Sequence, residues 1–138
     1  MLANRSMPGT TVIPELAYRD VTGAADWLCK AFGFTVRIAM GRHRAQLNVP
    51  PGGAVVLTSR PSAVAADRTH STMVRVENVD GLFEQATRAG AKVLGPPTTQ
   101  PYGERQCTLE DPGGHVWTFS QSVADRNPED WGGTVGVL

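Results

Sequence analysis

The stretch Glu110-Asp111-Pro112-Gly113-Gly114-His115 decides the fold, because its Pro-Gly-Gly centre repeats Pro51-Gly52-Gly53 at a distance of 61 residues. In the same way, Tyr18-Arg19-Asp20-Val21 precedes Val76-Glu77-Asn78-Val79 by 58 residues. Each copy shows the same order of patterns, with a strand, a helix that ends at glycine, and then three strands. A repeat of whole element patterns outweighs local propensity. The sequence therefore predicts two copies of one βαβββ unit.

The first unit is expected at residues 12–60. A strand at 12–18 precedes a helix whose N-cap is Asp20 or Thr22, and Gly33 provides its left-handed C-terminal stop. Three strands are expected at 34–40, 42–49 and 54–59, with the Pro-Gly turn between the last two. The apolar residues of the helix follow the i, i+3, i+4, i+7 spacing of one face: Ala25, Leu28, Cys29 and Phe32.

The second unit is expected at residues 71–121. A strand at 71–76 precedes a helix with Asp80 as N-cap and Gly90 at its end. Strands at 91–94, 104–109 and 115–120 follow. Residues 61–70 are interpreted as a linker and residues 122–138 as a C-terminal tail. Both units together form one domain over residues 12–121, in keeping with a chain of 138 residues.

Composition excludes several classes of partner. Thirteen Lys and Arg residues balance thirteen Asp and Glu residues, and no basic run occurs, so neither nucleic acid nor an anionic membrane is expected as a partner. No apolar run is long enough for a transmembrane helix. Cys29 and Cys107 fit no metal or redox spacing, so we expect a reducing, cytoplasmic location.

The repeat resembles the vicinal oxygen chelate superfamily, which contains glyoxalases, bleomycin-resistance proteins and extradiol dioxygenases. The resemblance rests on the two helix entries quoted above, on the helix ends Ala31-Phe32-Gly33-Phe34 and Arg88-Ala89-Gly90-Ala91, and on Tyr102-Gly103-Glu104-Arg105 with the stretch from Glu110 to Phe119. The tail from Asn127 to Gly132 is similar to the end of glyoxalase-like proteins without an assigned role. The resemblance implies an α+β fold in which two βαβββ units form curled mixed sheets around a cavity.

Active members of this superfamily hold a divalent metal with ligands from the first and fourth strands of each unit. The resemblance carries these positions to Ile13 and Leu57 in the first unit, and to Ser71 and Thr118 in the second. These residues do not form a catalytic metal site, and a register shift of one would add only His70. We therefore expect neither a metal nor another cofactor.

Candidate ligand-binding residues line the expected cavity: Glu15, Leu57, Ser71, Met73, Arg75, Arg105, Cys107 and Thr118. Glu15 and Arg75 could bind a polar ligand, or Glu15 could act as a general base, but the favoured interpretation is that each lies at a cavity mouth or forms a structural ion pair. Arg105 could clamp a carboxylate or be a solvated strand residue, and Cys107 could be a nucleophile or pack in the core.

Three further residues each have two possible roles. His115 is expected at the surface or in a dimer contact, because no metal spacing relates it to the other histidines. Tyr102 and Trp131 could cover a pocket by stacking on a ligand, but anchoring of a loop or tail is the favoured interpretation.

Three functions remain open at this point. The preferred one is a metal-free, glyoxalase-like protein that binds a small molecule, as bleomycin-resistance proteins do, in a homodimer. The alternative is a metal-dependent lyase, isomerase or dioxygenase of the same superfamily with an atypical site. The third is a structural or regulatory dimer with a vestigial pocket. The sequence does not identify the ligand, and a fold does not imply one function.

Overall fold

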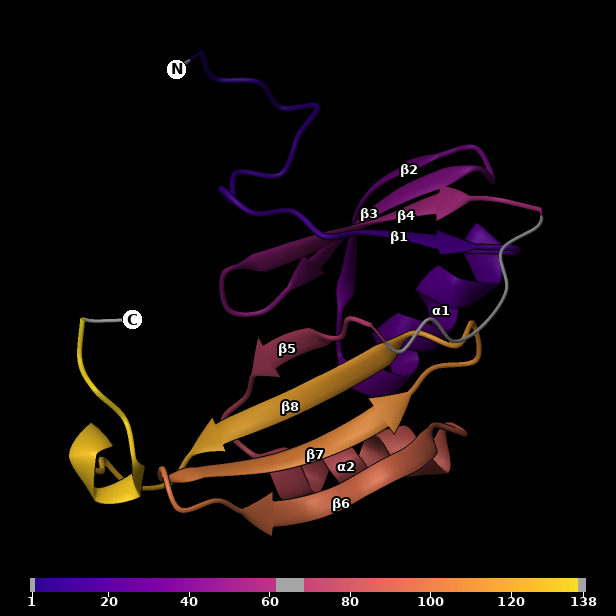
Figure 1. The fold of residues 1–138 in the computed structure, drawn as a ribbon. Helices are drawn as coiled ribbons and strands as arrows, with labels where there is room; N and C mark the ends of the chain where they lie inside the picture. The colour runs from indigo at the N-terminus through magenta and orange to yellow at the C-terminus, as the bar shows by residue number, and fades with distance from the viewer. Residues whose placement is uncertain (1, 62–68, 137–138) are drawn as a thin grey trace.

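The computed structural model describes residues 2–61 and 69–136 (Figure 1). Most of the expected linker at 61–70 therefore lies outside the described residues. The first unit contains β1 (Glu15–Tyr18), α1 (Val21–Phe32), β2 (Thr35–Met40), β3 (Arg44–Val49) and β4 (Gly53–Ser59). The second contains β5 (Thr72–Arg75), α2 (Val79–Arg88), β6 (Lys92–Thr99), β7 (Glu104–Glu110) and β8 (Val116–Ser122), and a short 3-10 helix follows at Pro128–Trp131.

Each unit forms one four-stranded mixed sheet. The strand order is β1-β4-β3-β2 in the first sheet and β5-β8-β7-β6 in the second. The first strand of each unit runs parallel to the fourth, and the other pairs are antiparallel. The helix supplies the crossover that a parallel pair requires. The predicted α+β class with two βαβββ units is thus confirmed, and neither sheet closes on itself.

Capping residues set the helix boundaries. The Asp20 carboxylate accepts a hydrogen bond from the Gly23 amide at 3.0 Å, and Gly33 ends α1 at a φ of 76°, which favours glycine. The predicted N-cap of α2 was wrong. Asn78, not Asp80, accepts from the Gly81 amide, because α2 begins two residues earlier than expected, at the fully buried Val79.

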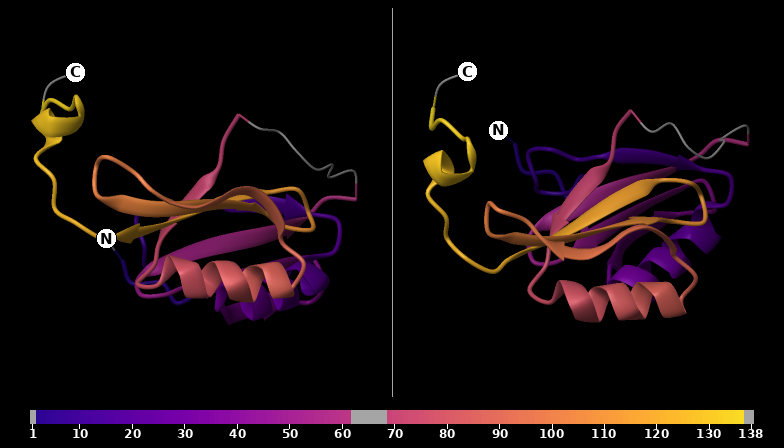
Figure 2. Two further views of the ribbon diagram at one scale, coloured as in Figure 1. Left: turned by 90° about the horizontal axis from the view of Figure 1, so that it is seen from below. Right: turned by 60° about the horizontal axis from the view of Figure 1, so that its bottom comes forward.

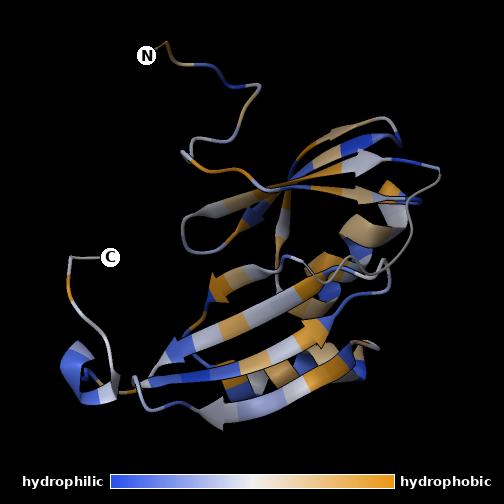
Figure 3. Ribbon diagram, viewed as in Figure 1, coloured by the Kyte–Doolittle hydropathy of each residue, from blue (hydrophilic) through white to orange (hydrophobic). Residues whose placement is uncertain are grey.

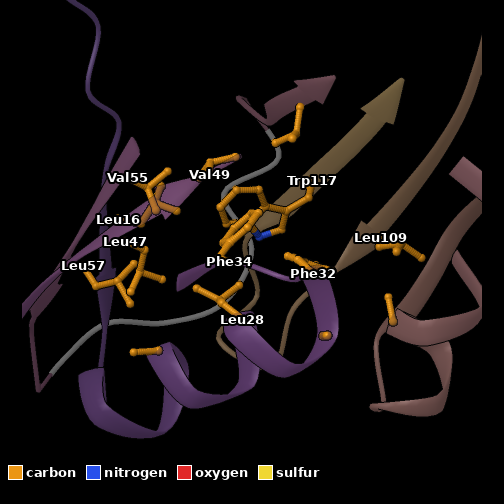
Figure 4. Packing of buried hydrophobic residues seen from close by; sticks show 14 of the residues in the cluster. Leu16, Leu28, Phe32, Phe34, Leu47, Val49, Val55, Leu57, Leu109 and Trp117 are labelled. Atoms are coloured by element: carbon orange, nitrogen blue, oxygen red, sulfur yellow. The ribbon is translucent and has the colours of Figure 1, made fainter. Parts of the chain in front are cut away.

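The two units share one hydrophobic core. Helices α1 and α2 lie side by side (Figure 2), and the Trp27 indole Nε1 donates to the Ala89 carbonyl at 2.7 Å across them. Phe32 at the end of α1 lies 4.7 Å from Phe119 of β8, measured between ring centroids. Trp117 of β8 packs against Phe34 of the first unit in the same way (Figure 4). Because both units bury aromatic side chains in one cluster, they fold as one body.

Each sheet has one face toward the helices and one face turned away, which we call the open face. Figure 3 shows hydrophobic bands on β8 and toward the end of β7, whose first half is hydrophilic. Along β7, Cys107 and Leu109 point to the helix and are buried, while Gln106 and Thr108, which alternate with them, face away. This period of two is the signature of a half-covered sheet. None of the described helices is long and apolar enough to cross a membrane.

We predict that Phe32→Ala lowers the free energy of unfolding by about 3–5 kcal/mol, because it leaves a cavity where both units meet. Urea denaturation followed by tryptophan fluorescence measures this loss. Met73→Ala is the matched control, because that side chain is 64% exposed and should change stability by less than about 0.5 kcal/mol. Equal losses in both variants would contradict the shared core.

Candidate ligand-binding site

A buried carboxylate joins the two units. Asp111 opens the turn between β7 and β8 and is 3% exposed. Its Oδ2 accepts hydrogen bonds from the Tyr18 hydroxyl of β1 and from Trp117 Nε1, the latter at 3.0 Å, and its Oδ1 accepts from the His115 amide at 2.9 Å. A buried charge is tolerated when its oxygens are satisfied in this way. The Asp-Pro-Gly-Gly turn is therefore a structural link between the units.

Tyr18 and His115 complete this link. Burial of Tyr18, together with the negative charge of Asp111, raises the pKa of the phenol far above its usual range, so the hydroxyl stays a donor. The His115 ring lies 4.6 Å from the Tyr18 ring, and its Nε2 donates to the Ala17 carbonyl at 2.7 Å. The expectation of a surface or dimer histidine is corrected, because this side chain bridges the two units. A Cβ on Gly113 would come within 2.5 Å of the Tyr18 ring, so that turn position requires glycine.

The open face of the first unit carries charged and amide groups. Arg44 of β3 forms an ion pair with Glu15 of β1, with 3.6 Å between Nη1 and Oε1. Gln46 of β3 lies opposite Val56 of β4, and both are 2% exposed although neither belongs to the hydrophobic cluster under the helix. The Gln46 amide oxygen accepts a hydrogen bond from Arg37 of β2. This face therefore combines an apolar floor with oriented donors.

The open face of the second unit carries a chain of hydrogen bonds. The Tyr102 hydroxyl donates to Gln106 Oε1 at 2.8 Å, Gln106 Nε2 donates to the Ser120 hydroxyl at 3.0 Å, and that hydroxyl donates to Glu104 at 2.6 Å. Hydrogen bonds from Ser120 and Ser122 hold the pKa of Glu104 below its usual value, and the positive charge of Arg75 adds to this effect. The carboxylate thus stays ionised and oriented at neutral pH.

Two clefts lie beside these groups. One of about 340 Å³ opens between the start of β1, the turn before β4 and strand β5, where Met73 and Arg75 contribute to its wall. The other, of about 530 Å³, lies between the first turns of α1 and the Asp111 turn. Its polar groups Tyr18 and Asp111 already bind each other. The first cleft adjoins an open face, because Met73 and Arg75 of β5 lie on that face.

A comparison with models of known protein families identifies the superfamily of this chain. The family model of the Glyoxalase/Bleomycin resistance protein/Dioxygenase superfamily matches residues 11–119. The chain belongs to this superfamily. The resemblance seen in the sequence is thereby confirmed.

Solved structures of the superfamily share the fold. TioX from Micromonospora sp. ML1 is 34% identical, over 83% of this chain and 99% of that chain, with a TM-score of 0.67. A bleomycin-binding protein complexed with bleomycin is 18% identical over 81% of this chain and 98% of its own, with a TM-score of 0.66.

An uncharacterised protein of Mycobacterium tuberculosis (strain ATCC 25618 / H37Rv) is 36% identical over 55 residues, which are 40% of this chain and 32% of that protein. The match spans about a third of the curated relatives' length.

The residues at the superfamily's metal-ligand positions do not fit a divalent metal. On β4, Val56 pairs with Glu15, and on β8, Thr118 pairs with Met73, so these are equivalent positions of the two units. Valine has no donor atom, and a threonine hydroxyl is a weak one. The described residues contain no group of three or more His, Cys, Asp or Glu side chains that could hold a metal ion.

The structure separates the predicted site residues into two groups. Those on or beside the open faces are Glu15, Ser71, Met73, Arg75 and Thr118, and those on the helix side are Leu57, Arg105 and Cys107. Arg105 donates from Nε and Nη2 to the two Asp80 carboxylate oxygens, each at 3.0 Å, and so ties β7 to α2. Glu15 forms a structural ion pair with Arg44, whereas Arg75 lies in the wall of the cleft beside β5 and acts on the Glu104 carboxylate.

Leu57 lies in the core because the fourth strands of the two units follow their turn glycines at different spacings. Val56, which pairs with Glu15 of β1, comes three residues after Gly53, whereas Thr118, which pairs with Met73 of β5, comes four residues after Gly114. Counting from the turn glycine therefore places the fourth strands out of step by one residue. A shift of one exchanges the two faces of a strand, so Val56 and not Leu57 corresponds to Thr118.

Sequence reasoning missed most of the polar network. Ser120 is expected on the cavity face with Thr118, but Gln46 and Gln106 were not singled out, although each is a polar residue next to a buried apolar one in its strand. That alternation was the available signal. Tyr102 and Trp131 contact each other at 5.6 Å between ring centroids, an arrangement in which the tail residue packs on the turn before β7.

We predict that Cys107 resists alkylation in the folded protein. It is 1% exposed, and burial raises the pKa of its thiol to about 11, so only about one molecule in a thousand carries the thiolate at pH 8. Peptide mass spectrometry after iodoacetamide treatment should find modified Cys29 but unmodified Cys107, and both modified in urea. Equal native rates at the two residues would contradict this placement and would revive Cys107 as a nucleophile.

Proposed function

We propose that this chain binds a small organic molecule on the open faces of its sheets, without a metal ion. The observation that carries this proposal is the chain of hydrogen bonds from Tyr102 through Gln106 and Ser120 to Glu104, which orients polar groups on a solvent-facing sheet. Small-molecule sites combine apolar walls with a few convergent polar groups. Met73, which is 64% exposed, supplies apolar surface on the open face of the second unit.

Two relatives support this proposal. The bleomycin-binding protein, whose structure contains bleomycin, shares the fold, and TioX shares both the fold and a third of the sequence. We extend ligand binding, but not a particular ligand, from the first of these to this chain.

We also propose a cytoplasmic location, because Cys29 and Cys107 are free thiols and reducing compartments preserve such thiols.

We further propose a homodimer in which the open faces of two chains cover one another. Neither sheet is closed, so β2 and β6 each leave an unpaired edge within the described fold, and Val36, Val93 and Leu94 on these strands are exposed. Exposed edges and apolar surface favour association. A stable contact would bury more than about 1,000 Å² in total.

Ligand binding is expected to be independent of metal and sensitive to the open face. We predict that the dye 1-anilinonaphthalene-8-sulfonate binds the native protein equally well with and without EDTA. Thr118→Trp should weaken binding at least tenfold, because the indole fills the open face beside Thr108. Arg88→Gln, at an exposed end of α2, is the control for a distant change.

Fluorescence titration measures the dissociation constant of the dye for the native protein and for each variant. Nickel- or zinc-dependent turnover of methylglyoxal hemithioacetal would contradict the metal-free proposal and would favour the enzymatic alternative of the superfamily. Dye binding that Thr118→Trp leaves unchanged would contradict the open face as the site.

The dimer has its own test. Sedimentation equilibrium at micromolar concentration should give twice the chain mass of 14.7 kDa. Trp131→Ala should weaken the dimer if this residue, 42% exposed beside Tyr102, lies in the contact. A single-chain mass at every concentration would refute the dimer, and an unchanged dimer in the variant would remove Trp131 from the contact.

A further inference from the structure

The N-terminal segment, residues 2–9, attaches to the open face of the first unit through main-chain carbonyls. Arg37 Nη2 donates to the Arg5 carbonyl at 2.8 Å, and Gln46 Nε2 donates to the Ser6 carbonyl at 2.7 Å. The segment lies on the side of the first sheet opposite α1 (Figure 1). Two successive carbonyl oxygens of the chain thus occupy two side-chain donors of β2 and β3.

These two donors also bind each other. Arg37 donates to Gln46 Oε1, which fixes the Gln46 amide so that its NH2 group points toward the segment. With the segment in place Gln46 is 2% exposed, so its side chain has little freedom to turn elsewhere. Loss of its acceptor would leave the Gln46 NH2 group unpaired, which costs free energy. Arg37 and Gln46 together therefore favour an acceptor oxygen at this place.

The segment itself is loosely attached. Its side chains from Leu2 to Met7 are exposed, with Leu2 95% and Met7 45% exposed. The Asn4 carboxamide oxygen accepts hydrogen bonds from the amide and hydroxyl of Ser6, a local turn that does not involve the sheet. Pro8 is buried and anchors the segment. The described contacts therefore allow residues 2–7 to leave while the sheet stays intact.

The charge of this face favours an anion over a neutral carbonyl. Strands β1 to β4 contain three charged side chains, Glu15, Arg37 and Arg44, and two of the three are cationic. Glu15 is paired with Arg44. A carboxylate accepts charge-assisted hydrogen bonds from a guanidinium, and these are about twice as strong as bonds to a neutral group.

Space for such a group adjoins the donors. A cleft of about 410 Å³ lies between Pro8 to Thr10 of the N-terminal side and the turn before β4, and Arg37 forms part of its wall. Apolar atoms of Pro50 and Pro51 line the same cleft. The combination suits an organic acid with an apolar body.

We propose that Arg37 and Gln46 form a carboxylate-binding site that the carbonyls of Arg5 and Ser6 occupy in the free protein, so that an organic acid displaces the N-terminal segment when it binds. This inference deepens the proposed function and rests on it, because it names an acid as the class of small molecule that the open face accepts. Because of this competition, the apparent affinity for the acid equals the intrinsic affinity multiplied by the fraction of chains in which the segment has left the site.

The test uses 2-naphthoate as the acid and 2-naphthamide as its uncharged analogue, both titrated into the full chain. We expect naphthoate to bind at least tenfold more tightly than the amide. Arg37→Gln should abolish that preference, and Arg88→Gln, which removes a distant positive charge, should preserve it. Pro8→Gly loosens the anchor of the segment and should tighten naphthoate binding several-fold.

A second measurement reports displacement directly. In ¹⁵N-labelled protein, the heteronuclear NOE of residues 3–7 should fall when naphthoate is added, and should already be low in Arg37→Gln. Equal binding of acid and amide would overturn the acid site while leaving small-molecule binding intact. Tight naphthoate binding with an unchanged NOE would overturn displacement by the acid. Binding of neither compound would overturn both this inference and the proposed function at this face.

Discussion

The Asp111 carboxylate is the interaction on which the arrangement of the two units depends. It lies in the β7–β8 turn of the second unit, but one of its hydrogen-bond donors, Tyr18, belongs to the first. The His115 side chain of the same turn reaches Ala17, also in the first unit. A buried charge requires full satisfaction, so these partners are constrained in position. The close approach of Gly113 to the Tyr18 ring belongs to the same constraint.

This link turns the helix sides of both sheets inward and leaves the other sides uncovered. Phe32, Phe34 and Trp117 can pack together because the turn brings β8 to the end of α1. The open faces then carry the polar side chains that the core cannot hold, and these bind one another across neighbouring strands. The shared core and the open faces are therefore two consequences of one packing arrangement.

The same fold in this superfamily serves different chemistries because function depends on the few side chains of the open faces. In this chain those side chains are amides, hydroxyls and isolated charges, with Val56 and Thr118 at the equivalent positions of the fourth strands. Such groups orient a ligand through hydrogen bonds, and they lack the donor set that holds a divalent ion. Both the proposed binding function and the acid site follow from this chemistry.

The sequence by itself determined the repeat, the element order and the stop at Gly33, and it offered Asp20 as one of two N-cap candidates. These features depend on local spacing and on backbone preferences of single residues. Tertiary structure alone decided three features. The fourth strand begins at a different spacing from the turn glycine in each unit, so Val56 corresponds to Thr118 and Leu57 lies in the core. Arg105 is held by Asp80 across a distance of 25 residues in sequence, and Gln46 is held by Ser6 across 40. Pairings over such separations are chosen by packing and by the need to satisfy buried polar groups, and no local pattern in a single sequence encodes them.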